Sequence, residues 1–537
     1  MKKNTGFLMT LRRTLCAVLA GSLCACSCAG CTSKTADTKP AVIDDNYRTY
    51  CEVFVRSYCD GNGDGIGDLK GLTQKLPYLS DTGFTGLWLM PICKSPSYHK
   101  YDVTDYCSID PQYGTMQDFE AFAAACHKKG IRVILDFVMN HTSSEHPWFQ
   151  KAVAYLKTLP KGAQPDLQKC PYVGYYNFHL AANPQANDRP VEGTDWAYEG
   201  VFSANMPDLN LSSTAVRKEM EKAASFWLNK GADGFRLDAA KEYFSGNTEK
   251  NVEVLHWFTN YVKSCSKNAY LVAEVWDTLP TIQDYYKSGI DSIFNYPYGN
   301  NDGQIIRTVN CNGNEDTIQK YGKNLVTVQN LLTQSNPKMI DAPFLSNHDV
   351  GRIAGFVNGD EARCKMAGAM NLLMSGSAFV YYGEELGMKG SGTDPNKRAP
   401  MYWNAKGTDG VTQPPPDCTV PQHPFGSYEE QKDNASSVYQ YYKQAIALRA
   451  KYPEIPRGKV TVANGLSKGC VSAIQKTWRQ SSCYILYNFS KSSTGVSLNS
   501  DAYKNLQLRD SLVTGGDQVR QQGIELTMPA RSIAVLS

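Results

Sequence analysis

The sequence predicts a (β/α)₈ barrel with a small domain inserted after the third strand and an antiparallel β-sandwich at the C-terminus. Three observations lead to this fold class. Eight short apolar runs alternate with amphipathic helical patterns between about residues 50 and 455, as in a closed ring of parallel strands. A segment rich in Pro, Gly, Asn and aromatic residues interrupts the alternation at 142–205. After residue 456, apolar and polar residues alternate between turn residues.

The eight apolar runs are the expected barrel strands. In chain order they read CEVFVRSY, TGLWLMPI, GIRVILDFV, DGFRLDA, AYLVAEVW, IDSIFNY, DAPFLSNHD and SAFVYYGEE. Helical patterns such as MQDFEAFAAACHKKG (116–130) and TAVRKEMEKAASFWLNKG (214–231) lie between them and end at Gly. A doubly wound sheet is the alternative, but no Gly-rich phosphate turn leads from the first strand into a helix.

The two segments that break the alternation set the domain boundaries. Residues 142–205 are too many for a simple βα connection, so we interpret them as an inserted domain. The barrel then comprises residues 47–141 and 206–455. Residues 456–537 form the C-terminal sandwich.

The first 46 residues indicate export and a tether. Basic residues precede a short apolar stretch and then small residues, a pattern typical of a secretory signal rather than of a membrane span. Residues 1–30 resemble a bacterial lipoprotein signal, in which Cys31 is acylated and residues 31–46 form a polar tether. Cys28 stands where such signals usually carry Leu, so Cys26 is a rival lipid site. We expect an extracellular lipoprotein anchored on the bacterial cell surface.

The composition excludes a nucleic-acid partner. Lys and Arg number 55 against 52 Asp and Glu, which gives a formal net charge of +3, and no basic run exceeds two residues. We expect an uncharged substrate and a monomer whose only membrane contact is the lipid anchor. The twelve cysteines from Cys51 to Cys483 follow no zinc pattern and permit either disulfides or free thiols.

Polar residues gather at the predicted strand ends, where a (β/α)₈ barrel carries its active site. Arg236 and Asp238 share one face of the fourth strand, the fifth ends at Glu274, and the seventh ends at His348 and Asp349. Carboxyl groups on neighbouring strands suit the cleavage of a glycosidic bond, which needs one ionised and one protonated group. Arg236 is expected to lower the pKa of Asp238, whereas apolar neighbours favour the protonated form of Glu274.

Five motifs resemble the conserved regions of the α-amylase family of glycoside hydrolases, in order and on the expected strands. They are DFVMNH (136–141), MPDLN (206–210), GFRLDAAKEY (234–243), AEVW (273–276) and FLSNHD (344–349). The resemblance implies a retaining mechanism with Asp238 as nucleophile and Glu274 as general acid/base. It implies that Asp349 stabilises the distorted sugar.

The resemblance also implies a set of side chains that contact the sugar. These are Tyr101, His141, Arg236, Lys241, His348 and Arg398. Tyr101 is expected to stack on the sugar and Lys241 to lie on the leaving-group side, where Glu242 replaces the histidine common in amylases. Three further polar residues are expected to hold the loop and the inserted domain instead, namely Asp136, Asn140 and Asp208.

The segment DGNGDGIGD (60–68) spaces oxygen ligands as a calcium loop does. The predicted ligands, at positions 1, 3, 5, 7 and 9 of the loop, are Asp60, Asn62, Asp64, the Ile66 carbonyl and Asp68. Members of the α-amylase family carry a similar loop after the first strand, so we expect a structural Ca²⁺. The closing acid of an EF-hand is missing, because position 12 is Gly71, and a solvated turn is the alternative.

The resemblance leaves endo-amylase, exo-glucosidase, pullulanase and transferase activities open. Ala239 after Asp238 is typical of enzymes that act on α-1,4 bonds. Met206 and Tyr98 stand where α-glucosidases of the family usually carry Gln and a pocket-blocking Asp. We therefore expect endo-acting hydrolysis of starch and maltooligosaccharides, with an exo-acting α-glucosidase or a transglycosylase as the alternative. A non-catalytic surface starch-binding lipoprotein is a third interpretation, but it would have no use for three carboxylates.

Overall fold

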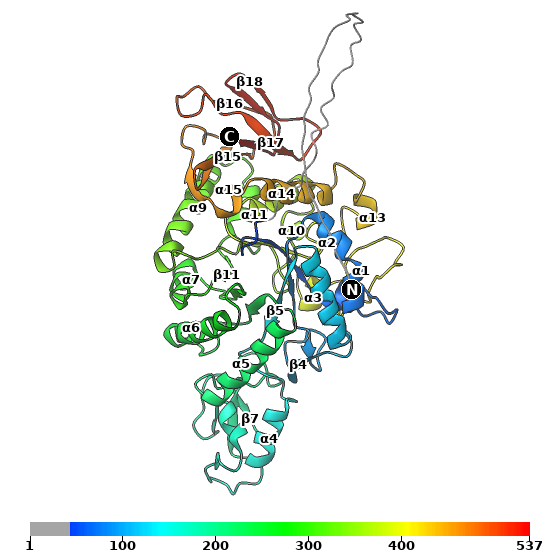
Figure 1. Ribbon diagram of the computed structural model, residues 1–537, viewed down its shortest axis with the longest axis vertical. Coiled ribbons are helices and arrows are strands. Elements are labelled where there is room, and N and C mark those ends of the chain that lie inside the picture. The colour runs from blue at the N-terminus through cyan, green and yellow to red at the C-terminus, as the bar shows by residue number, and fades with distance from the viewer. Residues whose placement is uncertain (1–42, 421) are drawn as a thin grey trace, which may run out of the picture. The chain divides into compact units, whose positions relative to one another are not determined.

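The computed structural model describes residues 43–420 and 422–537 (Figure 1). Its core is a parallel sheet of seven strands in the order β11-β10-β9-β5-β2-β1-β12. These strands are β1 (Thr49–Val53), β2 (Gly86–Leu89), β5 (Arg132–Phe137), β9 (Gly234–Leu237), β10 (Tyr270–Ala273), β11 (Ser292–Ile293) and β12 (Ala378–Tyr381). They are buried on both faces, which explains why the sequence shows continuous apolar runs rather than alternation.

The seventh predicted strand, within 341–349, is not a regular strand but closes the barrel through single hydrogen bonds. Ala342 forms an isolated parallel bridge with the residue after β11, and its carbonyl accepts the N–H of Asn295 at 3.0 Å. On the other side, Phe379 of β12 donates to the Pro343 carbonyl at 2.9 Å. Pro343 has no N–H to donate, so the ladder cannot continue. The eight positions form the predicted barrel, and the fold class is confirmed.

Helices connect the strands around the outside of the barrel (Figure 1). The longer ones are α3 (Met116–Lys128), α5 (Thr214–Asn229), α6 (Thr248–Cys265), α9 (Glu315–Ser335), α11 (Glu361–Leu372) and α14 (Val438–Lys451). The shorter ones are α1 (Leu69–Gln74), α2 (Leu76–Thr82), α7 (Leu279–Tyr285), α8 (Gln304–Val309), α10 (Ile353–Phe356), α12 (Asp394–Lys397) and α13 (Tyr428–Gln431). α3 begins at a capping box of Thr115 and Asp118 and buries Phe119, Phe122 and Cys126 on one face, as its amphipathic pattern predicts.

The inserted segment contains α4 (Pro147–Leu156) and a small antiparallel sheet in the order β6-β8-β7. Its strands are β6 (Phe178–Leu180), β7 (Asp188–Pro190) and β8 (Trp196–Glu199). Asn140 donates through its side chain to Asp208 at 3.1 Å, and its carbonyl accepts the N–H of Leu209 at 2.8 Å. These bonds fasten the end of the insertion beside the end of β5. An additional hairpin, β3 (Cys93–Lys94) and β4 (Asp105–Ile109), was not predicted.

The C-terminal region follows α15 (Glu454–Arg457) and consists of two antiparallel sheets. One sheet has the order β13-β14-β15-β20-β17 and the other β16-β19-β18. The strands are β13 (Lys459–Val462), β14 (Val471–Trp478), β15 (Ser481–Asn488), β16 (Thr494–Ser497), β17 (Leu508–Val513), β18 (Arg520–Gln522), β19 (Glu525–Met528) and β20 (Ser532–Leu536). Helix α9 of the barrel packs against β13 and β14.

Two expectations concern the ends of the chain and its cysteines. The signal sequence, the acylated Cys31, the rival Cys26 and most of the tether lie outside the described residues. Within the described part of the chain, no helix is both long and apolar enough to cross a membrane. The twelve cysteines from Cys51 to Cys483 are all free thiols in the structure.

Candidate active site

A pocket of about 380 Å³ lies at the carboxyl ends of the barrel strands. All three predicted catalytic carboxyl groups line it, namely Asp238, Glu274 and Asp349. Four of the predicted sugar contacts also line it: Tyr101, His141, His348 and Arg398. The structure therefore brings together seven of the nine residues that the sequence nominates for catalysis and sugar contact. The other two, Arg236 and Lys241, lie beneath and outside the pocket.

Arg236 forms the centre of a buried network of charges. One of its terminal nitrogens, Nη1, donates to Asp136 at 2.9 Å and to Asp238 at 2.6 Å. The other, Nη2, donates to Glu274 at 2.5 Å. The sequence explains this arrangement, because β5, β9 and β10 are neighbouring parallel strands and Arg236 is paired in register with both Asp136 and Val272. Arg236 thus lies under both predicted catalytic carboxyl groups rather than beside Asp238 alone.

Arg236 does act to lower the pKa of Asp238, as expected, but the net shift is upward. Burial raises the pKa of Asp238 to about 6, and the opposing effect of Arg236 only partly offsets it. Burial likewise raises the pKa of Glu274 to about 7, again against the effect of Arg236. The sequence could not show how deeply Asp238 is buried. The predicted order is kept, with Asp238 the more acidic of the two.

Ala239, directly after Asp238, adopts an unusual backbone conformation. Its φ of 44° lies in the left-handed region, which residues with a Cβ rarely occupy. The turn directs the Ala239 N–H to the Glu274 carboxyl group at 3.0 Å. The ends of β9 and β10 are therefore joined by a main-chain contact as well as by Arg236.

Asp349 is held between two cations. The Nε2 of His348 lies 3.0 Å from one Asp349 oxygen, and Arg398 donates to the other at 3.0 Å. Burial alone would raise the pKa of Asp349, but His348 and Arg398 hold it well below its usual range. The Nδ1 of His348 lies 2.6 Å from Glu52 on β1. Burial favours neutral His348, but Asp349 and Glu52 raise its pKa to about 9, so the ring is protonated at neutral pH.

Tyr101 is anchored by its hydroxyl group and packs on His348. The hydroxyl donates to Asp136 at 3.0 Å and lies 2.7 Å from the Nε2 of His348, and the two rings stack at 5.4 Å. Asp136 also accepts the indole N–H of Trp88 at 3.2 Å. Asp136 therefore positions Arg236 and Tyr101. This differs from the expectation that Asp136 holds the loop and the inserted domain.

His141 presents an unused nitrogen to the pocket. The side chain is 2% exposed, and its Nε2 has no hydrogen-bond partner among the described residues. Burial lowers its pKa to about 4, so the ring is neutral. Its ring lies 5.2 Å from that of Phe202, which also lines the pocket and is 49% exposed. A neutral imidazole beside an exposed aromatic ring suits a ligand that carries hydroxyl groups on an apolar face.

Lys241 lies outside the pocket. Its ammonium group donates to Asp277 at 3.0 Å and to the Trp276 carbonyl at 3.2 Å. Trp276 is 42% exposed and stacks on Tyr296 with ring centroids 5.1 Å apart. The contact of Lys241 with a leaving group stays a prediction. An exposed indole beside it, held by a second ring, is a suitable surface for a sugar ring.

Several pocket residues were missed by reading the sequence. His99, Phe202 and Asp394 line the pocket, and two residues outside its lining support it: Glu52 contacts His348, and Trp88 contacts Asp136. Glu52 carried a usable signal, because an acidic residue inside an apolar strand is as unusual as Arg236 in β9. Phe202 and Asp394 carried none, because they come from the insertion and from α12, and the positions of both segments depend on the fold.

The predicted calcium loop connects η1 (Val55–Ser57) to α1. Asp60 accepts the backbone N–H groups of Asn62, Gly63 and Gly65 at 2.7–3.1 Å. Asp68 caps α1 by accepting the N–H of Gly71 at 2.7 Å. Oxygen atoms of the type that Ca²⁺ prefers are thus present, but the described residues include no group of three or more His, Cys, Asp or Glu side chains placed to hold a metal ion. Calcium binding stays a prediction.

Comparisons with known proteins place this geometry in a family. Residues 52–458 match the family described as Alpha amylase, catalytic domain. Alpha-amylase 3 of Dictyoglomus thermophilum is 38% identical over 413 residues, 76% of this chain and 78% of that protein. Maltase 1 of Drosophila virilis is 31% identical over 500 residues, 76% of this chain and 74% of that protein. The solved structure of Eubacterium rectale Amy13B is 44% identical, has a TM-score of 0.89, and covers 93% of this chain and 96% of its own.

Proposed function

The chain belongs to the α-amylase family of glycoside hydrolases, and from that premise we propose that it cleaves internal α-1,4-glucosidic bonds of starch and related α-glucans with retention of configuration. The observation that carries the proposal is the Arg236 guanidinium group, which contacts Asp238 and Glu274 at once. One guanidinium group reaches two carboxyl groups only when these lie close together. Such closeness fits the spacing of about 5–5.5 Å in retaining enzymes better than the roughly 6.5–9.5 Å of inverting ones.

The proposed reaction uses the two carboxyl groups in turn. The Asp238 carboxylate attacks the anomeric carbon while protonated Glu274 gives its proton to the departing glycosidic oxygen. The sugar is then bonded to Asp238, and Glu274 is ionised. Glu274 takes a proton from an incoming water, whose oxygen attacks the same carbon and releases Asp238. The higher pKa of Glu274 supports its assignment as the acid.

The other pocket residues have supporting roles in the proposal. The Asp349 carboxylate, kept ionised by His348 and Arg398, faces the sugar and favours its positively charged transition state. The free Nε2 of His141 bonds a sugar hydroxyl group. Tyr101 offers a ring held rigidly by its hydroxyl contacts, on which the sugar stacks.

Cutting within a polymer is supported by residues at the edges of the pocket. Tyr98 occupies the position of the Asp that blocks the pocket in α-glucosidases of the family, and Met206 lines the pocket. The exposed Phe202 and Trp276 offer aromatic surfaces for a chain that extends beyond one sugar. The similarity to Alpha-amylase 3 agrees with this activity.

Exo-acting removal of terminal glucose is the second candidate, and one observation favours it. Arg398 donates to Asp349, and a carboxyl oxygen of Asp394 lies 3.7 Å from the Arg398 guanidinium group. Arg398 and Asp394 both line the pocket. The pair of Arg398 and Asp394 narrows the part of the active-site pocket that lies beyond the cleaved sugar. The similarity to Maltase 1 points in the same direction.

One experiment separates the two candidates. Starch, pullulan and maltotriose are digested in parallel, and iodine colour and reducing ends are followed over time. Under the endo proposal, iodine colour falls well before reducing ends accumulate, and maltose and maltotriose dominate late. Early glucose with persistent iodine colour establishes the exo activity instead. An Asp238→Asn preparation serves as the control for contaminating amylase.

Two further expectations belong to the proposed function. We propose that the chain is exported and attached to the cell surface through a lipid on Cys31, which would place the enzyme where polymeric starch is available. The basic, apolar and small-residue order of the N-terminus supports export. Labelling cells with a radioactive fatty acid, with Cys31→Ala and Cys26→Ala as variants, identifies the acylated residue.

A further inference from the structure

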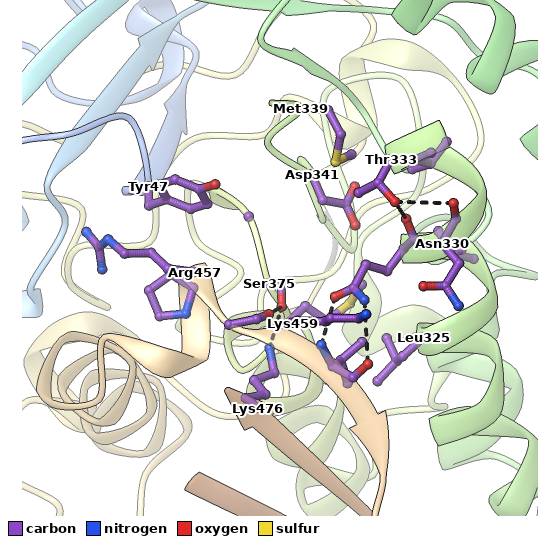
Figure 2. Close-up of a pocket in the computed structure, with 18 of the residues that line it drawn as sticks. Tyr47, Leu325, Asn330, Thr333, Met339, Asp341, Ser375, Arg457, Lys459 and Lys476 are labelled. Carbon is purple, nitrogen blue, oxygen red and sulfur yellow. Dashed lines mark hydrogen bonds between the residues drawn. The ribbon is translucent and has the colours of Figure 1, made fainter. Parts of the chain in front are cut away.

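A second pocket, of about 370 Å³, is lined by residues of the barrel and of the C-terminal region (Figure 2). Its walls come from α9, the turn before β12, α15, β13 and β14. Asp341 and Ser375 of its lining directly precede the seventh strand position and β12, so they belong to the amino ends of the strands. The catalytic carboxyl groups lie at the carboxyl ends. The second pocket is therefore separate from the active site.

A buried lysine contributes the first charged group of this pocket. Lys476 on β14 is 1% exposed, and it donates to the Ser375 hydroxyl at 3.0 Å and to the Ile455 carbonyl at 2.8 Å. Neither acceptor is charged. An ammonium group has three donors, so one N–H is left over. Burial lowers the pKa of Lys476 well below its usual value, the effect expected for a cation without a contacting anion.

An acidic residue contributes the second charged group. Asp341 accepts the side-chain amide of Asn295 at 2.9 and 3.0 Å and the N–H of Ala342 at 2.9 Å, all uncharged donors. Burial raises its pKa to about 6. Tyr298 beside it is 1% exposed, lines the pocket, and has a hydroxyl group without a hydrogen-bond partner among the described residues.

The two charged groups face each other across the pocket without touching. Figure 2 shows Asp341 on its upper side and Lys476 on its lower side. They are close enough to affect each other's pKa but form no salt bridge within the described residues. The other lining cations do not neutralise Asp341, because Arg457 is bonded to Asp45 at 2.8 Å and Lys459 is exposed. An acidic and a basic side chain, each without a charged contact, are thus held apart around a space large enough for a small molecule.

We propose that this pocket binds a small zwitterion of the amino-acid class, whose carboxylate bonds to Lys476 and whose ammonium group bonds to Asp341. The Tyr298 hydroxyl provides a further polar contact, and Leu325 and Met374 line the pocket for an aliphatic chain. An anion alone would leave Asp341 unpaired, a cation alone would leave Lys476 unpaired, and a neutral sugar would leave both unpaired. A zwitterion satisfies the two at once.

The occupant would connect two regions of the protein. Asp341 and Tyr298 belong to the barrel, whereas Lys476 belongs to the C-terminal sheet β13-β14-β15-β20-β17. Binding should therefore stabilise the contact between the barrel and this sheet. The expected signs are a higher melting temperature and an unchanged rate of starch hydrolysis.

The test varies the distance between the two charges of the probe. Glycine, β-alanine, 4-aminobutyrate, 5-aminopentanoate and lysine are titrated into the full chain by calorimetry and by thermal unfolding. One chain length should bind best and raise the melting temperature by about 1 °C or more at ten times its Kd. Butylamine and butyrate, which carry one charge each, should bind at least about tenfold more weakly. A saturating maltooligosaccharide in the active site should not compete.

Variants locate the binding site. Lys476→Met and Asp341→Asn should each reduce affinity at least tenfold, whereas Lys459→Met at the exposed rim should leave it within about twofold. Should either buried variant fail to fold, Tyr298→Phe removes one hydroxyl group only and should weaken binding about three- to tenfold. The proposal is overturned if no zwitterion binds, if these variants bind as the wild type does, or if maltose binds the pocket in their place.

Discussion

The two ends of the barrel hold buried charge in different ways. At the carboxyl end, Arg236 contacts Asp136, Asp238 and Glu274 directly, within 2.9 Å of each. At the amino end, Lys476 and Asp341 contact only uncharged groups. The first arrangement is complete before any ligand arrives, as catalysis requires of groups that must not reorganise during the reaction. The second arrangement lacks partners that a ligand could supply.

The difference follows from how the chain brings the groups together. Asp136 of β5 and Val272 of β10 lie directly beside Arg236 of β9, because neighbouring parallel strands are hydrogen-bonded in register. Lys476 meets the barrel through the packing of β14 on α9 and α15 and through its hydrogen bond to Ser375 before β12. The close charge contacts of Arg236 are therefore built along one sheet, whereas Lys476 and Asp341 come from two regions that meet.

The largest expected effect comes from removing the proposed nucleophile, Asp238, at the carboxyl end of the barrel. Asp238→Asn should lower kcat by at least about 10⁴-fold while oligosaccharide binding persists, because the fold and the sugar contacts are unchanged. Rates with maltooligosaccharides and binding by calorimetry measure the two properties. Substantial activity in this variant would remove Asp238 from the role of nucleophile.

The second prediction compares the two ends by stability. Arg236→Met leaves three buried carboxyl groups without their cation and should cost about 3–5 kcal/mol at pH 7. Lys476→Met removes a cation that has no anion in contact, so it should change stability by less than about 1 kcal/mol. Urea unfolding of both variants in one buffer measures the difference. Equal costs would show that the two ends do not differ.

Much of the active site was predictable from the sequence because its residues follow strands that are themselves visible as apolar runs. Asp238, Glu274 and Asp349 lie together because a closed parallel barrel places all strand ends on one face. The burial of Asp238 was not predictable, since it depends on neighbouring strands, and the net rise of its pKa was therefore missed.

The second pocket could not be predicted from the sequence at all. Lys476 lies in β14 between Gln475 and Thr477, where it reads as an ordinary polar residue, and Asp341 reads as the start of a strand. Only the packing of β14 against the barrel brings them to one space. The irregular seventh strand was also missed, although Pro343 within it was a signal.

The third prediction concerns how catalysis at the carboxyl end of the barrel depends on pH. Asp238 must be ionised, so kcat/KM should fall as the pH drops through about 6. Glu274 must be protonated, so kcat/KM should fall as the pH rises through about 7. Activity should therefore peak between these values and fall up to about tenfold per pH unit outside them. Glu274→Gln should lose the alkaline limb and retain more activity on aryl glycosides, whose leaving groups need no proton. A profile without an alkaline limb in the wild type would contradict this assignment.

The smallest expected effect concerns the 60–68 loop. Its carboxylates accept hydrogen bonds from backbone N–H groups, unlike the carboxyl groups that contact Arg236. Asp60 accepts three of them, which shapes the loop, but N–H groups only partly offset the repulsion among Asp60, Asp64 and Asp68. If Ca²⁺ supplies the missing positive charge, as Arg236 does for the catalytic pair, a chelator should lower the melting temperature of the wild type by about 2–5 °C.

Asp64→Ala should start at the lower melting temperature and respond little to the chelator, whereas Asp501→Ala, which changes an exposed acid elsewhere, should behave as the wild type does. Activity at low temperature should be nearly unchanged in both variants, because none of the loop residues lines the catalytic pocket. An identical melting curve with and without chelator would show that the backbone N–H groups suffice. The loop would then be a turn whose acidic residues need no cation. Only the buried charged groups at the two ends of the barrel would require a partner of opposite charge.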